Sequence, residues 1–233
     1  MKNTLLTWLM LLCLTGCSGL PGFKRSADPA GRSQPKATVG AQTSLADPSH
    51  QELAIAWETA QLAEQRGMDK EAIAAYLEVR RHDPDRPRVA HALAVLYDRS
   101  GMTDAASREY RAALEESPDD ANVHCDYGYF LYSTGDSPAA ESSLREALRL
   151  QPEHQQAMIN LALVVGSSGR YDEAQALFTE AIGPAAALHN VGMLRLRAGD
   201  VETAKRLLAE AQRRDPSISQ AEAVLARLSP PTP

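Results

Sequence analysis

The sequence predicts an all-α protein made of stacked helical hairpins, and three observations lead to this prediction. Alanine is abundant whereas aromatic residues make up only 5% of the chain, which suits closely packed helices better than a sheet. Glycines recur at a nearly constant interval, and alanines keep a fixed offset from them. Each interval carries two helical patterns of apolar residues. Such a repeat favours a solenoid.

The overall composition is ordinary for a soluble protein. The 233 residues are 44% hydrophobic and 23% charged, with a formal net charge of -6 and basic and acidic residues mixed along the chain. No block of Lys or Arg offers a surface for a polyanion, so we expect no nucleic-acid partner.

The first 16 residues are predicted to be a secretory signal. Met1 and Lys2 give a positive end, residues 5–15 are apolar, and small residues follow. The apolar run is shorter than the about 20 residues that a membrane-spanning helix needs. An ordinary signal peptide with incidental cysteines is the simpler interpretation.

The stretch Leu14-Thr15-Gly16-Cys17 resembles the bacterial lipobox. The resemblance implies that Cys17 becomes the first mature residue and carries diacylglycerol and an N-acyl chain such as palmitate, which anchors the protein on the periplasmic side of a membrane. Ser18 follows where retention at the inner membrane often uses aspartate, so the resemblance favours the outer membrane.

The mature chain is predicted to start with a tether. Residues 17–48 are rich in Gly, Pro, Ser and Ala without helical apolar spacing, which predicts disorder. Ser49 and Glu52 have the spacing of a capping box, so the first helix is expected to begin there. Cys125 is then the one unmodified mature cysteine, and the chain cannot close an internal disulfide.

The repeat begins after this tether. Its glycines are 34, 34, 34 and 30 residues apart, at Gly67, Gly101, Gly135, Gly169 and Gly199. Its alanines lie at Ala72, Ala106, Ala140, Ala174 and Ala204. Prolines close four of the units, at Pro84, Pro118, Pro152 and Pro216. Asp69, Ser137 and Asp200 are predicted to cap second helices, and Pro138 fits a first helical position.

This pattern resembles the tetratricopeptide repeat, as in Leu93, Ala94, Tyr97, Ala106 and Tyr110 of one unit. The resemblance implies a right-handed α-solenoid of about five helix-turn-helix units over residues 49–228, with a disordered tail at 229–233. The units are expected at about 53–86, 87–120, 121–154, 155–184 and 185–218, followed by a capping helix at 218–228. The fourth unit is four residues short at Gly183-Pro184, by neutral drift or to change the local pitch.

The family resemblance also assigns a groove lined by the first helix of each unit. It implies that the partner-binding positions are Trp57, Gln61, Arg88, His91, Asp126, Tyr129, Tyr132, Asn160, Leu163, His189, Asn190 and Met193. Asn160 and Asn190 hold the position at which relatives grip a ligand backbone through an amide, which both donates and accepts hydrogen bonds. The alternatives are structural: Trp57 as a cover for the first unit, the tyrosines as packing residues, and Asn160 as a cap or solvated amide.

Enzyme chemistry is not expected. The histidines are scattered singly at positions 50, 82, 91, 124, 154 and 189, without a metal-binding spacing, and no nucleophile or phosphate-loop motif is present. Cys125 with His91 or His124 could be imagined as a nucleophile and its base. His124 and Cys125 are adjacent, however, and adjacent residues do not share a helix face. We therefore expect no metal, no bound cofactor other than the lipid on Cys17, and no small-molecule substrate.

The expected function is a lipid-anchored periplasmic scaffold that binds extended segments of other proteins in its groove. The chain is similar in plan to the TadD-type tight-adherence pilus assembly lipoproteins and to the type IV pilus pilotins, which implies a role in assembling a pilus or secretion machine. A second hypothesis is an adaptor for enzymes of cell-wall synthesis or hydrolysis. A hydrolase is the third.

Overall fold

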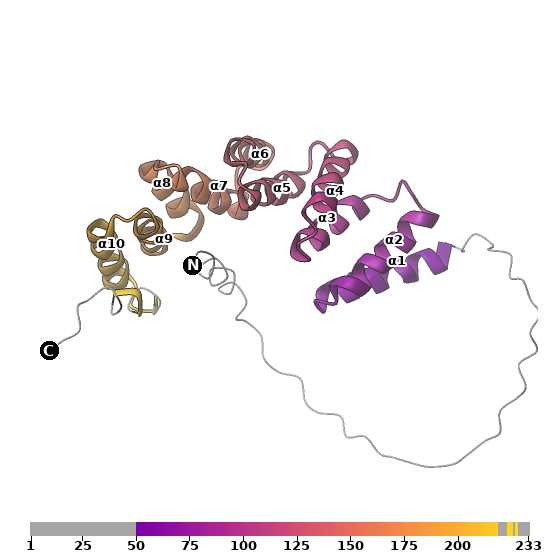
Figure 1. The fold of residues 1–233 in the computed structure, drawn as a ribbon, viewed down its shortest axis with the longest axis horizontal. Helices are drawn as coiled ribbons and strands as arrows, with labels where there is room; N and C mark the ends of the chain where they lie inside the picture. Colours follow the sequence, from indigo (N-terminus) through magenta and orange to yellow (C-terminus); the bar gives the residue numbers. More distant parts are fainter. Residues whose placement is uncertain (1–49, 219–222, 226, 228–233) are drawn as a thin grey trace, which may run out of the picture. The chain divides into compact units, whose positions relative to one another are not determined.

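The computed structural model describes residues 50–218, 223–225 and 227, and these residues form helices without a strand (Figure 1). The elements run in chain order as α1 (His50–Gln65), α2 (Asp69–His82), α3 (Val89–Arg99), α4 (Thr103–Glu116), α5 (Ala121–Thr134), α6 (Ser137–Leu150), α7 (Gln155–Ser167), α8 (Tyr171–Ile182), α9 (Pro184–Arg197) and α10 (Val201–Arg214). The predicted all-α class is confirmed. The expected signal, Cys17, tether, Ser49 and tail lie outside the described residues.

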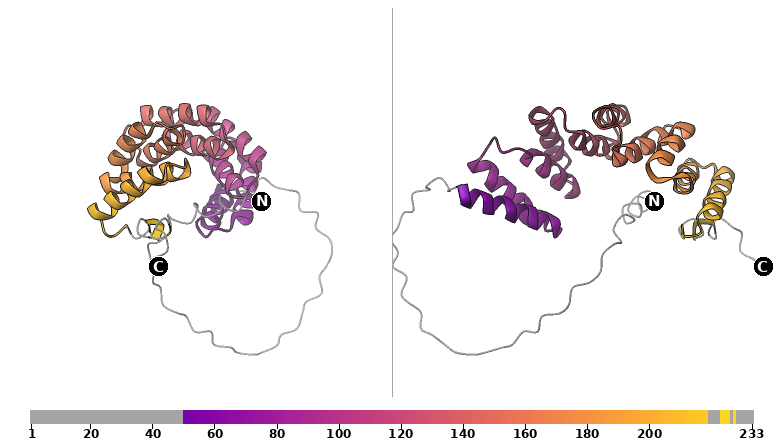
Figure 2. Two further views of the ribbon diagram at one scale, coloured as in Figure 1. Left: turned by 60° about the vertical axis from the view of Figure 1, so that its left-hand side comes forward. Right: turned by 180° about the vertical axis from the view of Figure 1, so that it is seen from behind.

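The helices form five antiparallel pairs, each an odd-numbered first helix followed by an even-numbered second helix. Figures 1 and 2 show that the pairs follow one another in chain order. Within each pair the turn holds the repeat glycine at positive φ, from 68° at Gly67 to 96° at Gly135, where a β-carbon would be strained. The recurring glycine is therefore required by the turn.

Helices α2, α4, α6 and α10 each end two residues before one of the expected prolines. Two of the predicted N-terminal caps, however, were wrong by one residue. Asp200 caps α10 by accepting a hydrogen bond from the Thr203 amide. At α6 the cap is Asp136, whose carboxylate accepts from the Ala139 amide, and Ser137 is already helical. Asp69 lies inside the first turn of α2, which has no side-chain cap, and its carboxylate pairs instead with Arg99. Asp136, one position before Ser137, has the non-helical backbone that a cap requires, with φ -90° and ψ 71°.

The shortened fourth unit is closed by a single residue. Gly183 alone separates α8 from α9, with φ 85° and ψ 163°, a conformation essentially restricted to glycine. Pro184 starts α9, where a missing amide hydrogen costs nothing. The chain therefore passes from one pair to the next without a loop.

The core lies between successive helices and uses small residues where they cross. Ala60, Ala94 and Ala162 are fully buried, and Gly128 and Gly192 take the same place in the third and fifth units. A β-carbon at Gly128 would lie 2.6 Å from Leu144 Cγ, so that helix pair needs glycine there.

The chain divides into two units, residues 1–45 and 46–233. All four clusters of buried hydrophobic residues lie within residues 46–233. This second unit, called here the repeat domain, therefore contains its own hydrophobic core, which is what a domain needs to fold alone. No helix among the described residues is long and apolar enough to cross a membrane.

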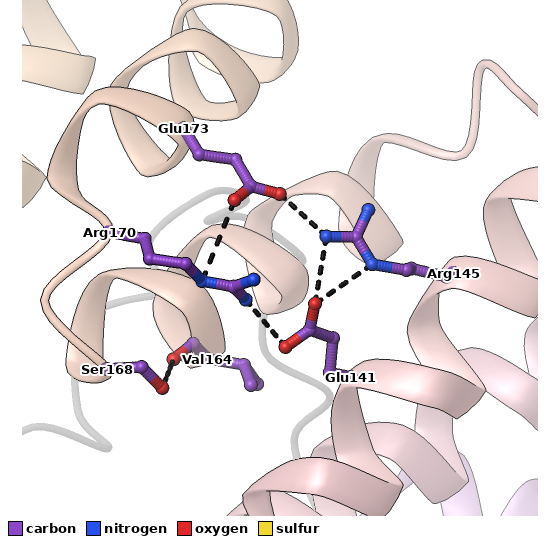
Figure 3. A network of polar contacts seen from close by, with 6 residues as sticks. All are labelled: Glu141, Arg145, Val164, Ser168, Arg170 and Glu173. Atoms are coloured by element: carbon purple, nitrogen blue, oxygen red, sulfur yellow. Dashed lines mark hydrogen bonds and ion pairs between the residues drawn. The ribbon is translucent and has the colours of Figure 1, made fainter.

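Side-chain ion pairs join the second helices of neighbouring units. Figure 3 shows a ring in which Glu141 of α6 contacts Arg145 and Arg170, and Glu173 of α8 contacts the same two arginines. The four contacts range from 2.6 to 3.7 Å. Nearer the start of the domain, Arg80 of α2 donates to both carboxylate oxygens of Glu109 on α4 at 2.9 and 2.8 Å.

Candidate protein-binding face

The first helices form one side of the repeat domain. Successive first helices touch one another, as α3 touches α5, α5 touches α7 and α7 touches α9, in addition to packing on their own second helices. The backbones of the described second helices approach one another less closely, and the ion pairs between them are made by long side chains. The first helices therefore approach more closely and lie on the inner side of the stack. We call their solvent-facing surface the inner face.

Eleven of the twelve sequence-predicted site residues lie on first helices, and Arg88 directly precedes α3. From the start of the domain they are Trp57 and Gln61 on α1, His91 on α3, Asp126, Tyr129 and Tyr132 on α5, Asn160 and Leu163 on α7, and His189, Asn190 and Met193 on α9. All but Asn160 are half-buried or exposed. The prediction of which residues bind a partner remains a prediction.

The first part of the inner face is held by an aromatic contact. The half-buried Trp57 ring packs edge-on against Tyr76 with centroids 5.4 Å apart, and the Arg86 guanidinium lies 4.9 Å from the indole centroid. Tyr76 donates a hydrogen bond to Glu64 at 2.7 Å. Burial, followed by this bond, raises the pKa of Tyr76. Trp57 thus covers the core of the first unit while exposing part of its ring.

Arg88 adopts an unusual backbone conformation for its residue type. It is the one non-glycine residue with positive φ, 73°, in the part of the chain that the structure describes. As the residue before α3 it turns the chain into the helix, and its side chain is exposed. A left-handed backbone at a residue with a β-carbon costs about 1 to 2 kcal/mol, so the turn at Arg88 is strained by about this amount.

The centre of the inner face carries a group of acidic side chains. His91 Nε2 lies 2.8 Å from Asp126 Oδ2, a contact that joins α3 to α5. Burial raises the pKa of the Asp98 carboxyl, and the negative charge of Asp126 adds to the rise. The pKa of the buried Tyr110 phenol is raised for the same reasons, by burial first and by Asp126 and Asp98 next. Asp98 is therefore a carboxylate that lacks a nearby cation to offset its burial.

Two further contacts join α5 to α7. The Tyr132 hydroxyl lies 2.7 Å from Ser167 Oγ. Asn160 donates to Cys125 Sγ at 3.5 Å and accepts a hydrogen bond from Gln156 at 3.0 Å. Asn160 is only 4% exposed. The Asn160 amide, already hydrogen-bonded and buried, is therefore poorly placed to pair with a ligand backbone.

The last part of the inner face is formed by α9. Asn190 is half-buried and donates to the Ala186 carbonyl of its own helix at 3.1 Å, so its amide is closer to solvent than that of Asn160. Burial lowers the pKa of His189, which keeps this imidazole neutral near pH 7. Met193 beside them is half-buried and adds a flexible apolar surface.

Gln156 and Ser167 each contact a predicted site residue, but neither was predicted from the sequence. Gln156 precedes Asn160 by four residues on α7, a spacing that brings two helical side chains together, so this signal was available. No comparable signal points to Ser167, because its contact with Tyr132 depends on how two units pack.

Cys125 and His124 do not form a nucleophile pair. Cys125 is 1% exposed, and burial raises the pKa of its thiol to about 12. The His124 ring nitrogen Nε2 contacts the Pro118 carbonyl at 2.9 Å instead. No group of three or more His, Cys, Asp or Glu side chains suited to a metal ion occurs among the described residues.

Comparison with known proteins bears on the fold. The family described as cilia and flagella-associated protein 70 middle TPR-like domain matches residues 90–192. No curated protein sequence matches the chain.

Solved structures match over most of the described chain. PilW, a widely conserved type IV pilus biogenesis factor, has a TM-score of 0.61 at 19% identity, covering 77% of this chain and 90% of its own. YrrB, a TPR protein with an unusual peptide-binding site, has a TM-score of 0.56 at 20% identity, covering 71% and 87%. MamA has a TM-score of 0.60 at 19% identity, covering 74% and 96%. The chain thus has the fold of a tetratricopeptide-repeat solenoid.

Proposed function

We propose that this protein is a lipid-anchored scaffold whose inner face binds an extended segment of a partner protein during assembly of a pilus or secretion machine. The observation that carries the proposal is the set of half-buried aromatic, amide, acidic and apolar side chains that successive first helices contribute. Such a surface can pair with a peptide backbone and seat alternate side chains. The fold itself is typical of protein-interaction scaffolds rather than enzymes.

The acidic group at the centre of the inner face defines one property of the segment. Burial raises the pKa of the Asp98 carboxyl on α3, and the negative charge of Asp126 on α5 adds to the rise. Both carboxylates also add to the raised pKa of the buried Tyr110. A Lys or Arg from a partner would relieve this repulsion, whereas an acidic segment would increase it. The proposed segment therefore carries a basic residue opposite Asp98, with apolar residues toward Leu163 and Met193.

The lipid anchor is supported by the sequence around Cys17, and the role in pilus assembly by the similarity of plan to TadD-type lipoproteins and pilotins, with PilW among the similar structures. A scaffold for envelope assembly needs both a fixed position and a protein-binding surface. The chain offers a candidate for each in separate parts.

Fractionation and capture from the native cell envelope test the two parts together. We expect the full chain in the membrane fraction and the Cys17→Ser variant in the soluble fraction. Affinity capture followed by mass spectrometry should identify a pilus or secretion component, and Asp98→Asn should reduce its yield. Retention of Cys17→Ser in the membrane would contradict the anchor. Capture of cell-wall enzymes in place of pilus components would contradict the assembly role.

A further inference from the structure

The first unit exposes two apolar side chains that every later unit buries. Ile55 and Leu62 on α1 are 56% and 46% exposed. The residues at the matching repeat position to Ile55 are Val89, Val123, Ala157 and Ala187, and those matching Leu62 are Leu96, Phe130, Val164 and Leu194. All eight are at most 8% exposed. These positions are therefore built for contact with another helix.

The later units bury these positions against the second helix of the unit before. Val89 and Leu96 of α3 belong to one cluster with Tyr76 and Val79 of α2. Phe130 of α5 likewise clusters with Tyr110 of α4. The first unit has no preceding unit in the described residues, so this side of α1 is a helix-stacking face that none of the described helices covers.

The chain itself does not offer an obvious cover for this face. Residues 18–48 lack the helical apolar spacing that a covering helix needs. The opposite end of the repeat domain is also not a bare stacking face, because Ala204, Leu208 and Ala211 of α10 are fully buried. Head-to-tail stacking of two copies is therefore disfavoured.

The charges beside the two apolar residues make the face complementary to itself. Glu52, Ile55, Thr59, Leu62 and Arg66 follow one another at intervals of three and four residues, so they form one stripe along α1 and its last turn. The stripe is acidic at its start, apolar in the middle and basic at its end, over about 21 Å. An antiparallel copy centred on Thr59 places Ile55 beside Leu62 of the second copy and Glu52 beside Arg66.

We propose that this stripe, called here the α1 stripe, pairs with the same stripe of a second copy to form a two-fold symmetric dimer. A two-fold interface uses the same patch on both copies, which a self-complementary stripe satisfies. The area is small compared with that of stable dimers, so association is weak, in about the micromolar range. The dimer leaves the inner faces of both copies open and does not depend on what they bind.

Sedimentation velocity of the repeat domain, residues 46–233, tests the dimer. We expect a concentration-dependent dimer at about 0.1 mM and at least tenfold weaker association, roughly, for Ile55→Glu with Leu62→Glu, with unchanged circular dichroism. Met102→Glu is the matched control, because Met102 is 50% exposed and apolar but lies outside the stripe. It should dimerise like the unchanged domain.

Disulfide trapping tests the antiparallel orientation. Mixing Ile55→Cys and Leu62→Cys domains should give the mixed disulfide dimer in preference to either symmetric one, and Gln61→Cys, exposed on the same helix, should give little. The buried Cys125 does not compete. A domain that remains monomeric at about 0.1 mM would overturn the proposal and leave the face to a different protein. A dimer insensitive to the double substitution would overturn it as well.

Discussion

His91 Nε2 lies 2.8 Å from Asp126 Oδ2, and the two residues are 35 positions apart in the sequence. The contacts between Cys125 and Asn160 and between Tyr132 and Ser167 have the same separation of 35. Since the repeat is 34 residues long, α3 contacts α5, and α5 contacts α7, at a position one residue further along the repeat. Polar contacts at a regular spacing therefore connect the successive first helices α3, α5 and α7.

Asn160 and Asn190 hold the same repeat position but are expected to respond differently to truncation. Asn160→Ala leaves the buried Cys125 thiol without its partner and opens a small gap beside it, so the free energy of unfolding should fall by about 1 to 3 kcal/mol. Asn190→Ala removes a contact within one helix and should cost less than about 0.5 kcal/mol. Urea denaturation measures both, and equal losses would contradict the assignment of Asn160 as a structural residue.

The crossing of α5 and α6 depends on Gly128. In Gly128→Ala the new methyl would lie 2.6 Å from Leu144 Cγ and 3.2 Å from the Ala140 carbonyl oxygen, which should destabilise the protein by about 1 to 3 kcal/mol. Gly192→Ala is the matched change in the last unit, where the nearest atom would be 3.1 Å away, and its loss should be smaller. Thermal unfolding compares the two. A Gly128→Ala protein as stable as the original would refute the close approach.

Ionised Asp98 should destabilise the fold near neutral pH. Its folded pKa is raised, by burial first and then by Asp126, so the folded state disfavours the carboxylate at pH values above that pKa. Asp98→Asn removes this cost and should raise the free energy of unfolding at pH 7. The gain should shrink as the pH falls through the raised pKa and vanish below the ordinary value of 3.8, where both states are protonated.

Unfolding measured from pH 3 to 7 tests this dependence, with the exposed loop variant Asp119→Asn as control. A gain that does not change with pH would show that the effect of Asp98→Asn is not electrostatic.

The two sets of ion pairs between second helices should differ in strength. The Glu109 side chain is 13% exposed and receives two bonds from Arg80, so Glu109→Gln should cost about 1 to 2 kcal/mol. Glu141 in the ring of Figure 3 faces arginines that are 50% and 42% exposed, and Glu141→Gln should cost less than about 1 kcal/mol, most of it lost in about 1 M salt. Denaturation at low and high salt measures this, and the reverse order would contradict it.

The sequence predicts the turns and crossings well because they are set within one repeat. Gly101 and Gly135 are fixed by their own backbone conformations, and Ala94 and Ala140 by the helix that each directly faces. These constraints repeat with the period, so they can be read from the pattern.

The contacts between units could not be read in the same way. Asn160 is buried because the small Cys125 of the preceding unit receives it and Gln156 covers it, which depends on the packing of two units. The cap at Asp136 was missed because Asp136 and Ser137 are adjacent and both residue types cap helices. The exposure of Ile55 also follows from its place in the first of the described units, not from its repeat position.

We propose that the inner face, and not the outer side of the second helices, holds the partner. The most direct test of this proposal places a photo-reactive benzoylphenylalanine at Tyr129 of α5 or at the exposed Ala176 of α8 in the full chain, and irradiates intact cells. We expect a cross-linked partner from position 129, which Asp98→Asn weakens, and none from position 176. Cross-linking at position 176 alone, or equally at both, would contradict it.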